Sequence, residues 1–335
     1  MSSDPRPVWA DAEVVESVPV TDRVRRITLR RPAGPTRGRK AQPGTHIDVR
    51  VTTPKGEDVR SYSVVESSSD GSLVTISVML AESSRGGSRH MHGLAVGDRI
   101  GCTQPLQNFE LRHGADSYVL LAGGIGITAV IEMGRVLHRL GQDYRFVYVG
   151  RSREQMAYLD ELAELHGDRL QLCVDDEGTS LDVDALVSGL PERGRTEVYV
   201  CGPIRLMDAV RRSWLDRGRS IADLRFETFG SSGWFEPEPF EVAIPELGVR
   251  TVVESDSSLL EALAAAGADM MYDCRKGECG LCEVRISGLQ GRVDHRDVFL
   301  SDEEKATDAS VCICVSRVAA AEDAERGTGR LTLTL

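Results

Sequence analysis

The sequence predicts a multidomain chain: an antiparallel β-barrel, then a doubly wound α/β domain, then a smaller α+β domain. Residues 12–112 form short alternating strands separated by Gly/Pro turns, such as "TISVML" and "GDRIGCTQP", which is typical of an antiparallel barrel. Strands then alternate with helical segments, as in a parallel sheet. A strand pair, a helix and a cysteine-rich loop come last. We expect domains at 1–112, 113–229 and 239–335, with a Gly/Ser/Pro-rich linker at 230–238.

Charge and hydropathy exclude several classes of protein. The formal net charge is -12, whereas binding to nucleic acid requires a basic face. No apolar run approaches the roughly 18 residues of a membrane helix, and the N-terminus lacks an apolar signal core. We expect a cytoplasmic protein that binds neither nucleic acid nor membrane and is a monomer when isolated.

Three of the eight cysteines share one short loop, "CRKGECGLC". Cys274, Cys279 and Cys282 have the spacing C-x4-C-x2-C, whereas structural zinc sites repeat C-x2-C pairs. This is the spacing of a plant-type 2Fe–2S cluster, whose fourth thiolate lies far downstream. Gly277 and Gly280 allow the loop to wrap closely, with backbone N–H groups directed at the sulfides. A zinc site and buried structural thiols are the alternatives.

The fourth cluster ligand is ambiguous from spacing. The segment "ASVCICVSR" offers Cys312 and Cys314, which lie on the same face of an extended strand, and both fit the distance from Cys282. Residues 240–273 predict two strands, a turn and a helix capped by Ser257 or Ser258. "CEVRISG" predicts a further strand after the loop, so this region looks like a β-grasp ferredoxin domain.

The segment "SYVLLAGGIGITAVIEMG" predicts a strand, a glycine turn (Gly123–Gly126) and a helix from about Thr128. This arrangement offers free N–H groups and a positive helix end to a pyrophosphate, although a plain βα turn is the alternative. A second strand, in "EVYVCGPIRLMDAV", ends at Cys201-Gly202-Pro203. Two such turns in one parallel sheet predict a dinucleotide site.

The barrel region offers a second small anion-binding turn. "RSYSVVES" (Arg60–Ser67) is a predicted strand, and "SSRGGSRHMH" contains Gly86-Gly87-Ser88 before a predicted short helix. Successive small residues there form a nest of N–H groups suited to phosphate. His90 and His92 are expected on the solvent side, and His295, further on, as a surface or capping residue.

In their order, these motifs resemble the ferredoxin–NADP reductase superfamily and, with the cysteine loop, the phthalate dioxygenase reductase and vanillate demethylase reductase family. The resemblance implies FMN in the barrel, with Tyr62 against the isoalloxazine ring, Ser63 near its N5 atom, and Arg60 and the Gly86–Ser88 turn at the phosphate. The cofactor-binding residues expected in the two upstream domains are Arg60, Ser61, Tyr62, Ser63, Val78, Met79, Leu80, Gly86, Gly87, Ser88, Gly123, Gly124, Ile125, Gly126, Thr128, Arg151, Cys201, Gly202, Pro203 and Phe229.

The same resemblance assigns roles at the reacting centre. It implies that Thr128 and Cys201 lie near the nicotinamide, with Gly202 leaving room for it. Phe229 matches an aromatic residue that shields the flavin until nicotinamide arrives, although interdomain core is an equal alternative. Ser63, Thr128, Cys201 and Phe229 are thus the expected catalytic set. The "CVSR" segment points to Cys314 as the fourth cluster ligand.

The expected function is a reductase that takes hydride from NADH onto FMN and passes single electrons through the cluster to a separate Rieske-type oxygenase of an aromatic hydroxylation or demethylation system. The acceptor is expected to dock near Arg275 and Lys276. NADPH is the alternative donor, since Arg151, Ser152 and Arg153 follow the second strand of the α/β domain. A reductase for a cytochrome P450 and a non-catalytic iron–sulfur module are the alternative functions.

Overall fold

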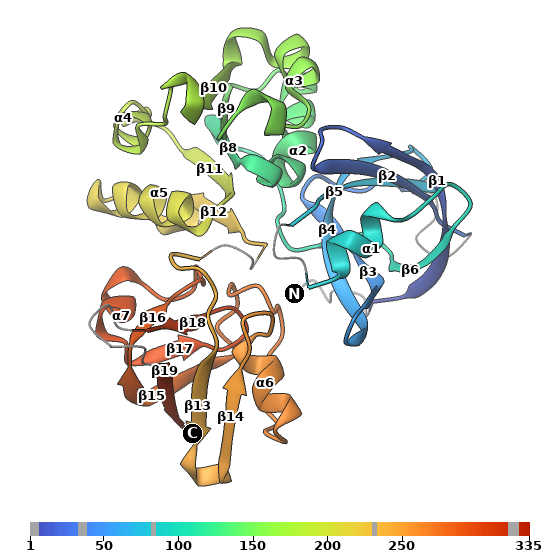
Figure 1. Cartoon of the computed structure of the whole chain (residues 1–335). Helices are drawn as coiled ribbons and strands as arrows, with labels where there is room; N and C mark the ends of the chain where they lie inside the picture. Colours follow the sequence, from blue (N-terminus) through green and yellow to red (C-terminus); the bar gives the residue numbers. More distant parts are fainter. Residues whose placement is uncertain (1–6, 33–38, 82–84, 230–232, 321–327) are drawn as a thin grey trace. The chain divides into compact units, whose positions relative to one another are not determined.

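The computed structural model describes residues 7–32, 39–81, 85–229, 233–320 and 328–335 (Figure 1). Backbone packing divides the chain into two compact units. One combines Met1–Gly202 with Ser213–Phe226, and the other combines Pro203–Arg212 with Glu227–Leu335. The three expected domain boundaries stay predictions. Within the described ranges, no helix is long and apolar enough to cross a membrane.

The first part of the chain forms the predicted antiparallel barrel. Its strands follow the order β4-β5-β2-β1-β6-β3, and β3 also pairs with β4, which closes the sheet. Alternate residues such as Ile47, Val49 and Val51 point into the core, as the period of a strand requires. The elements are β1 (Trp9–Pro19), β2 (Val24–Arg30), β3 (Thr45–Thr53), β4 (Gly56–Ser67), β5 (Leu73–Met79), α1 (Gly87–His92), β6 (Arg99–Thr103) and the short β7 (Leu106–Gln107).

The second part is the predicted doubly wound sheet. Its strands follow the order β10-β9-β8-β11-β12, and β10, β9, β8 and β11 run parallel. The strands are β8 (Ser117–Gly123), β9 (Tyr144–Gly150), β10 (Leu170–Val174), β11 (Thr196–Cys201) and β12 (Leu224–Glu227). The helices are α2 (Ile127–Arg139), α3 (Leu159–His166), α4 (Val183–Ser188) and α5 (Ile204–Asp216), with short 3-10 turns at η1 (Gly124–Gly126), η2 (Arg153–Gln155), η3 (Gly167–Arg169), η4 (Asp175–Glu177) and η5 (Ile221–Asp223).

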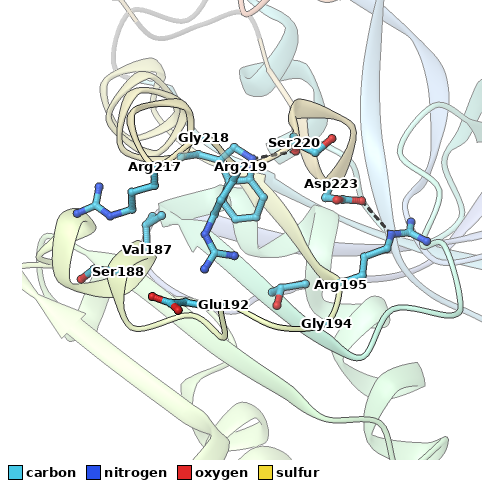
Figure 2. Close-up of a pocket in the computed structure, with 12 residues that line it drawn as sticks. Val187, Ser188, Glu192, Gly194, Arg195, Arg217, Gly218, Arg219, Ser220 and Asp223 are labelled. Atoms are coloured by element: carbon cyan, nitrogen blue, oxygen red, sulfur yellow. Dashed lines mark hydrogen bonds and ion pairs between the residues drawn. The ribbon is translucent and has the colours of Figure 1, made fainter.

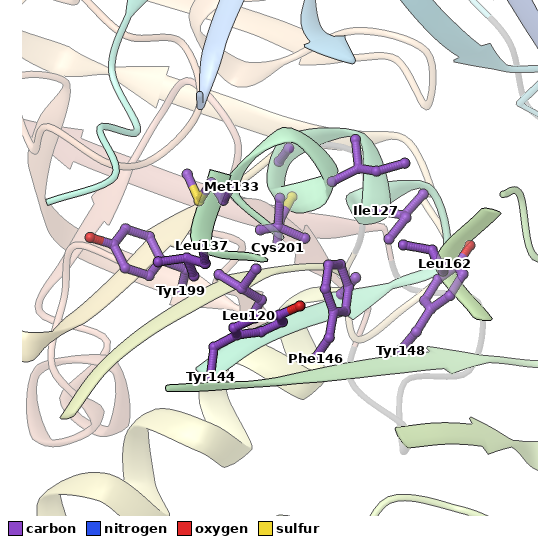
Figure 3. Close-up of a cluster of buried hydrophobic side chains, with 14 of the residues drawn as sticks. Leu120, Ile127, Met133, Leu137, Tyr144, Phe146, Tyr148, Leu162, Tyr199 and Cys201 are labelled. Atoms are coloured by element: carbon purple, nitrogen blue, oxygen red, sulfur yellow. The ribbon is translucent and has the colours of Figure 1, made fainter. Parts of the chain in front are cut away.

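The doubly wound sheet and its helices, called the nucleotide half below, are supported by one hydrophobic core. Figure 3 shows Leu120, Phe146 and Ile127 converging between the sheet and α2. Val24 and Val65 of the barrel belong to the same buried cluster. The barrel and the parallel sheet therefore share apolar packing, which limits independent motion of the two halves.

The C-terminal unit contains the predicted α+β fold. Its sheet follows the order β14-β13-β19-β15-β17. The Ser258 side chain caps α6, and Glu261 completes a capping box, so the Ser258 alternative is confirmed. The elements are β13 (Phe240–Ile244), η6 (Pro245–Leu247), β14 (Val249–Val253), α6 (Leu259–Ala265), β15 (Glu283–Gln290), β16 (Arg292–Asp294), α7 (Asp302–Thr307), β17 (Ser310–Cys312), β18 (Arg317–Ala319) and β19 (Gly329–Thr334).

The expectation for His295 is wrong, because this residue is buried. Its Nε2 atom lies 3.1 Å from Oδ1 of Asp308, and its Nδ1 atom lies 3.6 Å from Oδ1 of Asp297. Buried polar groups are kept by such partners, so His295 is a structural residue of this unit.

Candidate functional site

The two glycine turns of the nucleotide half lie against each other. Adjacent parallel strands place Ala122 opposite Cys201. A Cβ atom on Gly126 would lie 2.1 Å from the Cys201 carbonyl oxygen and 3.0 Å from the Gly202 nitrogen. Only glycine allows this approach. The carboxyl ends of β8 and β11 thus lie together, at the edge of the sheet where a nucleotide usually binds.

Thr128 helps to shape the first turn of α2. Its hydroxyl donates a hydrogen bond to the Ile125 carbonyl at 2.9 Å, and the residue is buried. The first turn of the helix contains no acidic side chain. Its N-terminal N–H groups therefore keep the positive potential that suits a pyrophosphate. Cys201, the other expected contact of the nicotinamide, is fully buried at the end of β11.

Acidic residues flank the arginines that follow β9. Arg153 binds both carboxylate oxygens of Glu177, with nitrogen–oxygen distances of 2.5 and 2.9 Å. This pairing raises the pKa of Arg153 and lowers the pKa of Glu177. The Asp176 N–H donates to the Arg151 carbonyl at 3.0 Å. Arg151 is exposed, and its contact with this acidic turn is made by its backbone carbonyl.

The expected phosphate residues of the barrel are neighbours in space. A Cβ atom on Gly87 would lie 3.1 Å from Cγ of Arg60, so the glycine turn lies directly against the Arg60 side chain. Gly86 has a φ of 105° and would place a Cβ atom 2.6 Å from Pro54. Nη1 of Arg60 lies 2.6 Å from Oδ2 of Asp58. This ion pair holds the positive charge of Arg60 beside the turn.

The middle of β4 presents the residues expected near the flavin ring. Tyr62 packs against the barrel core, and burial raises its pKa, with Arg60 acting in the opposite direction. Ser63 is buried and pairs across the sheet with His46. The hydroxyl of Ser61, in contrast, donates to Asp48 at 2.6 Å and is exposed.

The end of β5 lies beside α1. Val78 is buried, whereas Met79 is 38% exposed and Leu80 is partly buried. The Val78 carbonyl is 2.8 Å from Nε2 of His92, so the expectation that His92 lies on the solvent side is wrong. The hydroxyl of Ser88 accepts a hydrogen bond from the Ala81 N–H at 3.2 Å. These bonds hold the glycine turn against the strand.

The cysteine loop is an irregular segment shaped by glycine and by sulfur. Gly277 and Gly280 both have a φ of 75°. A Cβ atom on Gly280 would lie 2.2 Å from the Phe299 ring. The backbone N–H groups of Lys276 and Glu278 each donate to the Cys274 sulfur at 3.4 Å. Hydrogen bonds stabilise a thiolate. The bond from the Cys314 thiol, followed by these backbone bonds, lowers the pKa of Cys274 to about 4.

The fourth cysteine position is distinguished by its neighbours. The Cys314 side chain is hydrogen-bonded to both Cys274 and Cys282, whereas the Cys312 side chain is hydrogen-bonded to Cys282. Cys314 therefore lies nearer the middle of the group. Among the described residues, no three His, Cys, Asp or Glu side chains surround one point closely enough to hold a single ion. A two-iron cluster divides its four thiolates between two irons, so the donors and the glycine cradle fit that group.

The segment before the linker is attached to the cysteine loop. The Thr228 N–H donates to Glu278 at 2.7 Å, and its hydroxyl bonds the Lys276 carbonyl. Burial raises the pKa of Glu278, and the nearby Lys276 opposes this effect. Phe229, the next residue, is 37% exposed.

A cavity of about 580 Å³ lies elsewhere in the nucleotide half (Figure 2). It is found where β11 begins, at Thr196, which is the opposite end of that strand from Cys201. Arg195 beside it is bonded to Asp223, and Arg219 is bonded to the carbonyls of Leu190 and Pro191. Nucleotide sites of such sheets form at the carboxyl ends, so this cavity is separate from the expected site.

Known proteins resemble the chain over nearly its whole length. The family model of the 2Fe-2S iron-sulfur cluster binding domain matches residues 244–319. The carnitine monooxygenase reductase subunit of Acinetobacter pittii is 34% identical over 299 residues, which are 89% of this chain and 96% of that protein. The structure of phthalate dioxygenase reductase, described as modular for electron transfer from pyridine nucleotides to 2Fe-2S, is 28% identical, with a TM-score of 0.68 and 98% of each chain covered.

A third similarity is to a longer protein. The crystal structure of an intact type IV self-sufficient cytochrome P450 monooxygenase is 35% identical, with a TM-score of 0.63. The match covers 98% of this chain but only 41% of that one. This chain therefore spans less than half of that protein.

The fold and these similarities define an NAD(P)H-dependent oxidoreductase that uses a flavin and a 2Fe–2S cluster. The chain belongs to the phthalate dioxygenase reductase and vanillate demethylase reductase family. The alternative of a non-catalytic iron–sulfur module is thereby set aside.

Sequence reasoning did not single out Arg135 or Tyr158. Both connect the nucleotide half to the barrel, since Arg135 binds the Val65 carbonyl and Tyr158 binds Ser77. Neither belongs to a motif, and the partners are far away in the chain. No local pattern could have found them.

Proposed function

We propose that this protein oxidises NADH with FMN and delivers single electrons through its 2Fe–2S cluster to a separate Rieske-type oxygenase, in an aromatic hydroxylation or demethylation system. The proposal rests on the presence of three local features in one chain, each suited to one cofactor. They are the Arg60–Gly87 contact, the Gly126–Cys201 contact and the Cys274 loop. When bound, the flavin takes hydride from nicotinamide and the cluster carries single electrons.

The residues of the chain bind and orient these groups. Arg60 and the Gly86–Ser88 turn would hold one terminal phosphate, which favours FMN over a dinucleotide flavin. The N-terminus of α2 would hold the pyrophosphate of the nicotinamide cofactor. Cys274, Cys279, Cys282 and Cys314 would hold the cluster. No acid–base side chain is required at the reacting centre, because hydride transfer depends on orientation.

The choice of NADH is supported by the acidic turn beside Arg151. Arg153 is already bound by Glu177, and Asp176 is bonded to the Arg151 backbone. A 2′-phosphate would therefore bring its charge towards carboxylates, which is unfavourable. We expect Glu177→Gln to improve the KM for NADPH more than that for NADH, and Arg151→Glu to change the KM values for NADH and NADPH to a similar, small extent. If Arg151→Glu weakens NADPH far more than NADH, Arg151 binds a 2′-phosphate and the NADH assignment is wrong.

The acceptor would dock on an apolar edge of the cluster loop, made of Tyr272, Leu281 and Phe299. These side chains are 45%, 46% and 44% exposed, and Phe299 packs on Gly280, next to the exposed Cys279. Aromatic and apolar side chains are typical of interface cores.

The two cations expected near the docking site, Arg275 and Lys276, have different surroundings. The Lys276 ammonium lies 3.8 Å from Glu227 and is only 12% exposed, so its charge is not offered to a partner. Arg275 instead stacks on the Tyr272 ring, with its guanidinium carbon 4.5 Å from the ring centroid. The cation available at this edge is therefore Arg275.

A haem-containing acceptor is the second candidate. It is supported by the 35% identity to the self-sufficient cytochrome P450 monooxygenase, which covers 98% of this chain. A cytochrome P450 on a separate chain would use the same electron exit. The two acceptors are distinguished by testing reduction of a Rieske oxygenase and of a P450 by the purified protein and NADH.

The first experiment is a visible spectrum of the protein, with identification of the released flavin, before and after anaerobic NADH or NADPH. We expect FMN, a broad cluster absorbance, and bleaching of both by NADH at lower concentration than by NADPH. Released FAD would overturn the phosphate assignment. If the flavin is bleached while the cluster stays oxidised, electrons do not pass from flavin to cluster, and that step of the proposal is wrong.

A further inference from the structure

Arg135 lies within α2, the helix that begins at the nucleotide turn. Its Nη1 atom donates to the Val65 carbonyl at 2.6 Å and to Glu132 at 3.1 Å. Its Nε atom donates to Glu161 of α3 at 2.9 Å, and the side chain is only 20% exposed. One guanidinium thus joins α2, α3 and β4.

The bond to Val65 occurs at an irregularity of β4, the strand that carries Arg60, Tyr62 and Ser63 and is called the flavin strand below. The register of β4 with β5 shifts between Val64 and Glu66, so Val65 lies in a β-bulge. Bulges interrupt the ladder and turn neighbouring side chains. The Val65 carbonyl receives its hydrogen bond from Arg135, two residues beyond Ser63. The orientation of this end of the flavin strand therefore depends on a side chain of the nucleotide half.

A second bond joins β5, the other strand expected to bind the flavin, to the nucleotide half. The hydroxyl of Tyr158 lies 2.5 Å from the hydroxyl of Ser77, which directly precedes Val78 in β5. Tyr158 immediately precedes α3, which carries Glu161, and burial raises the pKa of Tyr158 so that it keeps its proton. Both β4 and β5 are thus tied to the α2–α3 pair.

We propose that Arg135 is a positioning residue, which holds the β4 bulge against α2. It would thereby keep β4 and the nucleotide turn (Gly123–Gly126) at a fixed position relative to each other. This inference rests on the proposed function. A planar guanidinium holds its partners in one fixed geometry, whereas the three donors of an ammonium group rotate. Hydride transfer is sensitive to this position, since a displacement of about 1 Å can cost about 100-fold in rate.

The test compares Arg135→Met and Arg135→Lys with Arg139→Met, an exposed arginine one turn further along α2. Hydrogen exchange of the purified protein is measured for peptides covering residues 62–67 and 196–201. Stopped-flow then gives the limiting rate of flavin reduction and the Kd for NADH. For Arg135→Met we expect faster exchange only in residues 62–67 and a limiting rate at least about tenfold lower. Flavin content and Kd should change less than twofold, Arg135→Lys should lie between, and Arg139→Met should match the wild type.

Unchanged exchange in residues 62–67, or a rate loss matched by an equal loss of NADH affinity, would overturn the inference. Tyr158→Phe removes one oxygen and provides a second variant if Arg135→Met does not fold; it should show the same pattern more weakly, and a wild-type profile would count against the inference. If NADH fails to reduce even the wild-type flavin, the proposed function fails instead, while the exchange result still tests the positioning of β4.

Discussion

The nucleotide turn (Gly123–Gly126) and the cluster loop (Cys274–Cys282) are both glycine-rich, but different forces shape them. The turn joins β8 to α2, and its Gly126 lies against the end of β11. The cluster loop, all of which the structure describes, contains neither helix nor strand before β15. It includes Arg275 with a φ of 53°, a left-handed conformation that is rare outside glycine and clusters at functional sites.

The difference concerns where each site obtains its stability. The sheet and its core hold the nucleotide turn through backbone pairing, independently of ligand. The cluster loop is held by hydrogen bonds to the Cys274 sulfur and by the hydrogen bond from the Thr228 N–H to the Glu278 carboxylate. Because metal sites of this kind link binding to folding, the loop should depend on its cluster much more than the turn depends on its nucleotide.

The largest effect is expected from Cys314→Ser, with Cys312→Ser as the matched control. Cys314 is bonded to two of the loop cysteines and Cys312 to one. Cys314→Ser should lose most bound iron and the cluster absorbance, with faster hydrogen exchange over residues 274–282 but not over 123–128. Flavin content should be retained. If Cys312→Ser loses the cluster and Cys314→Ser keeps it, the ligand assignment is reversed.

A smaller effect is expected from Gly126→Ala in the nucleotide turn. The added Cβ atom would meet the Cys201 carbonyl at 2.1 Å, and overpacking of this kind costs about 1–3 kcal/mol. We expect the Kd for NADH to rise at least about tenfold, with iron and flavin content unchanged. Gly93→Ala is the control, since its φ of -81° is, like that of Gly126, in the helical region and the atom nearest to the added Cβ is 3.4 Å away. An equal rise of the Kd for NADH in both variants would show that the contact with Cys201 is not responsible.

The smallest effect is a pH dependence confined to the nucleotide half. Burial, followed by the charges of His138, Arg135 and Arg169, lowers the pKa of His166 to about 4. The unfolded state therefore binds a proton at a higher pH, so the free energy of unfolding should fall as pH drops from about 6.5 to 4, by at most about 3 kcal/mol.

Urea unfolding of the wild type and of His166→Asn at pH 7, 5.5 and 4.5 measures this dependence. The variant should be less stable at pH 7, because the 2.7 Å bond to Tyr144 changes, but it should lose less stability on acidification. Parallel pH profiles of the two proteins would show that His166 contributes nothing to acid sensitivity.

Local patterns predicted more of the cluster loop than of its surroundings. The cysteine spacing, the two glycines and the Ser258 cap are all visible within a few residues. Burial of His295 between two aspartates, and capture of Lys276 by Glu227, depend on segments that approach only after folding. The sequence pattern around each residue therefore does not show these partners.

The sequence by itself determined the order of the elements, the two nucleotide-sheet turns and three thiolate positions, because backbone conformation and hydrophobic period are short-range properties. Only the tertiary structure decided which downstream cysteine is bonded to both Cys274 and Cys282, and that Arg135 binds the Val65 carbonyl of β4. The Arg135–Val65 bond joins residues 70 positions apart. Contacts of that range follow from how the sheets pack together, and no local pattern encodes them.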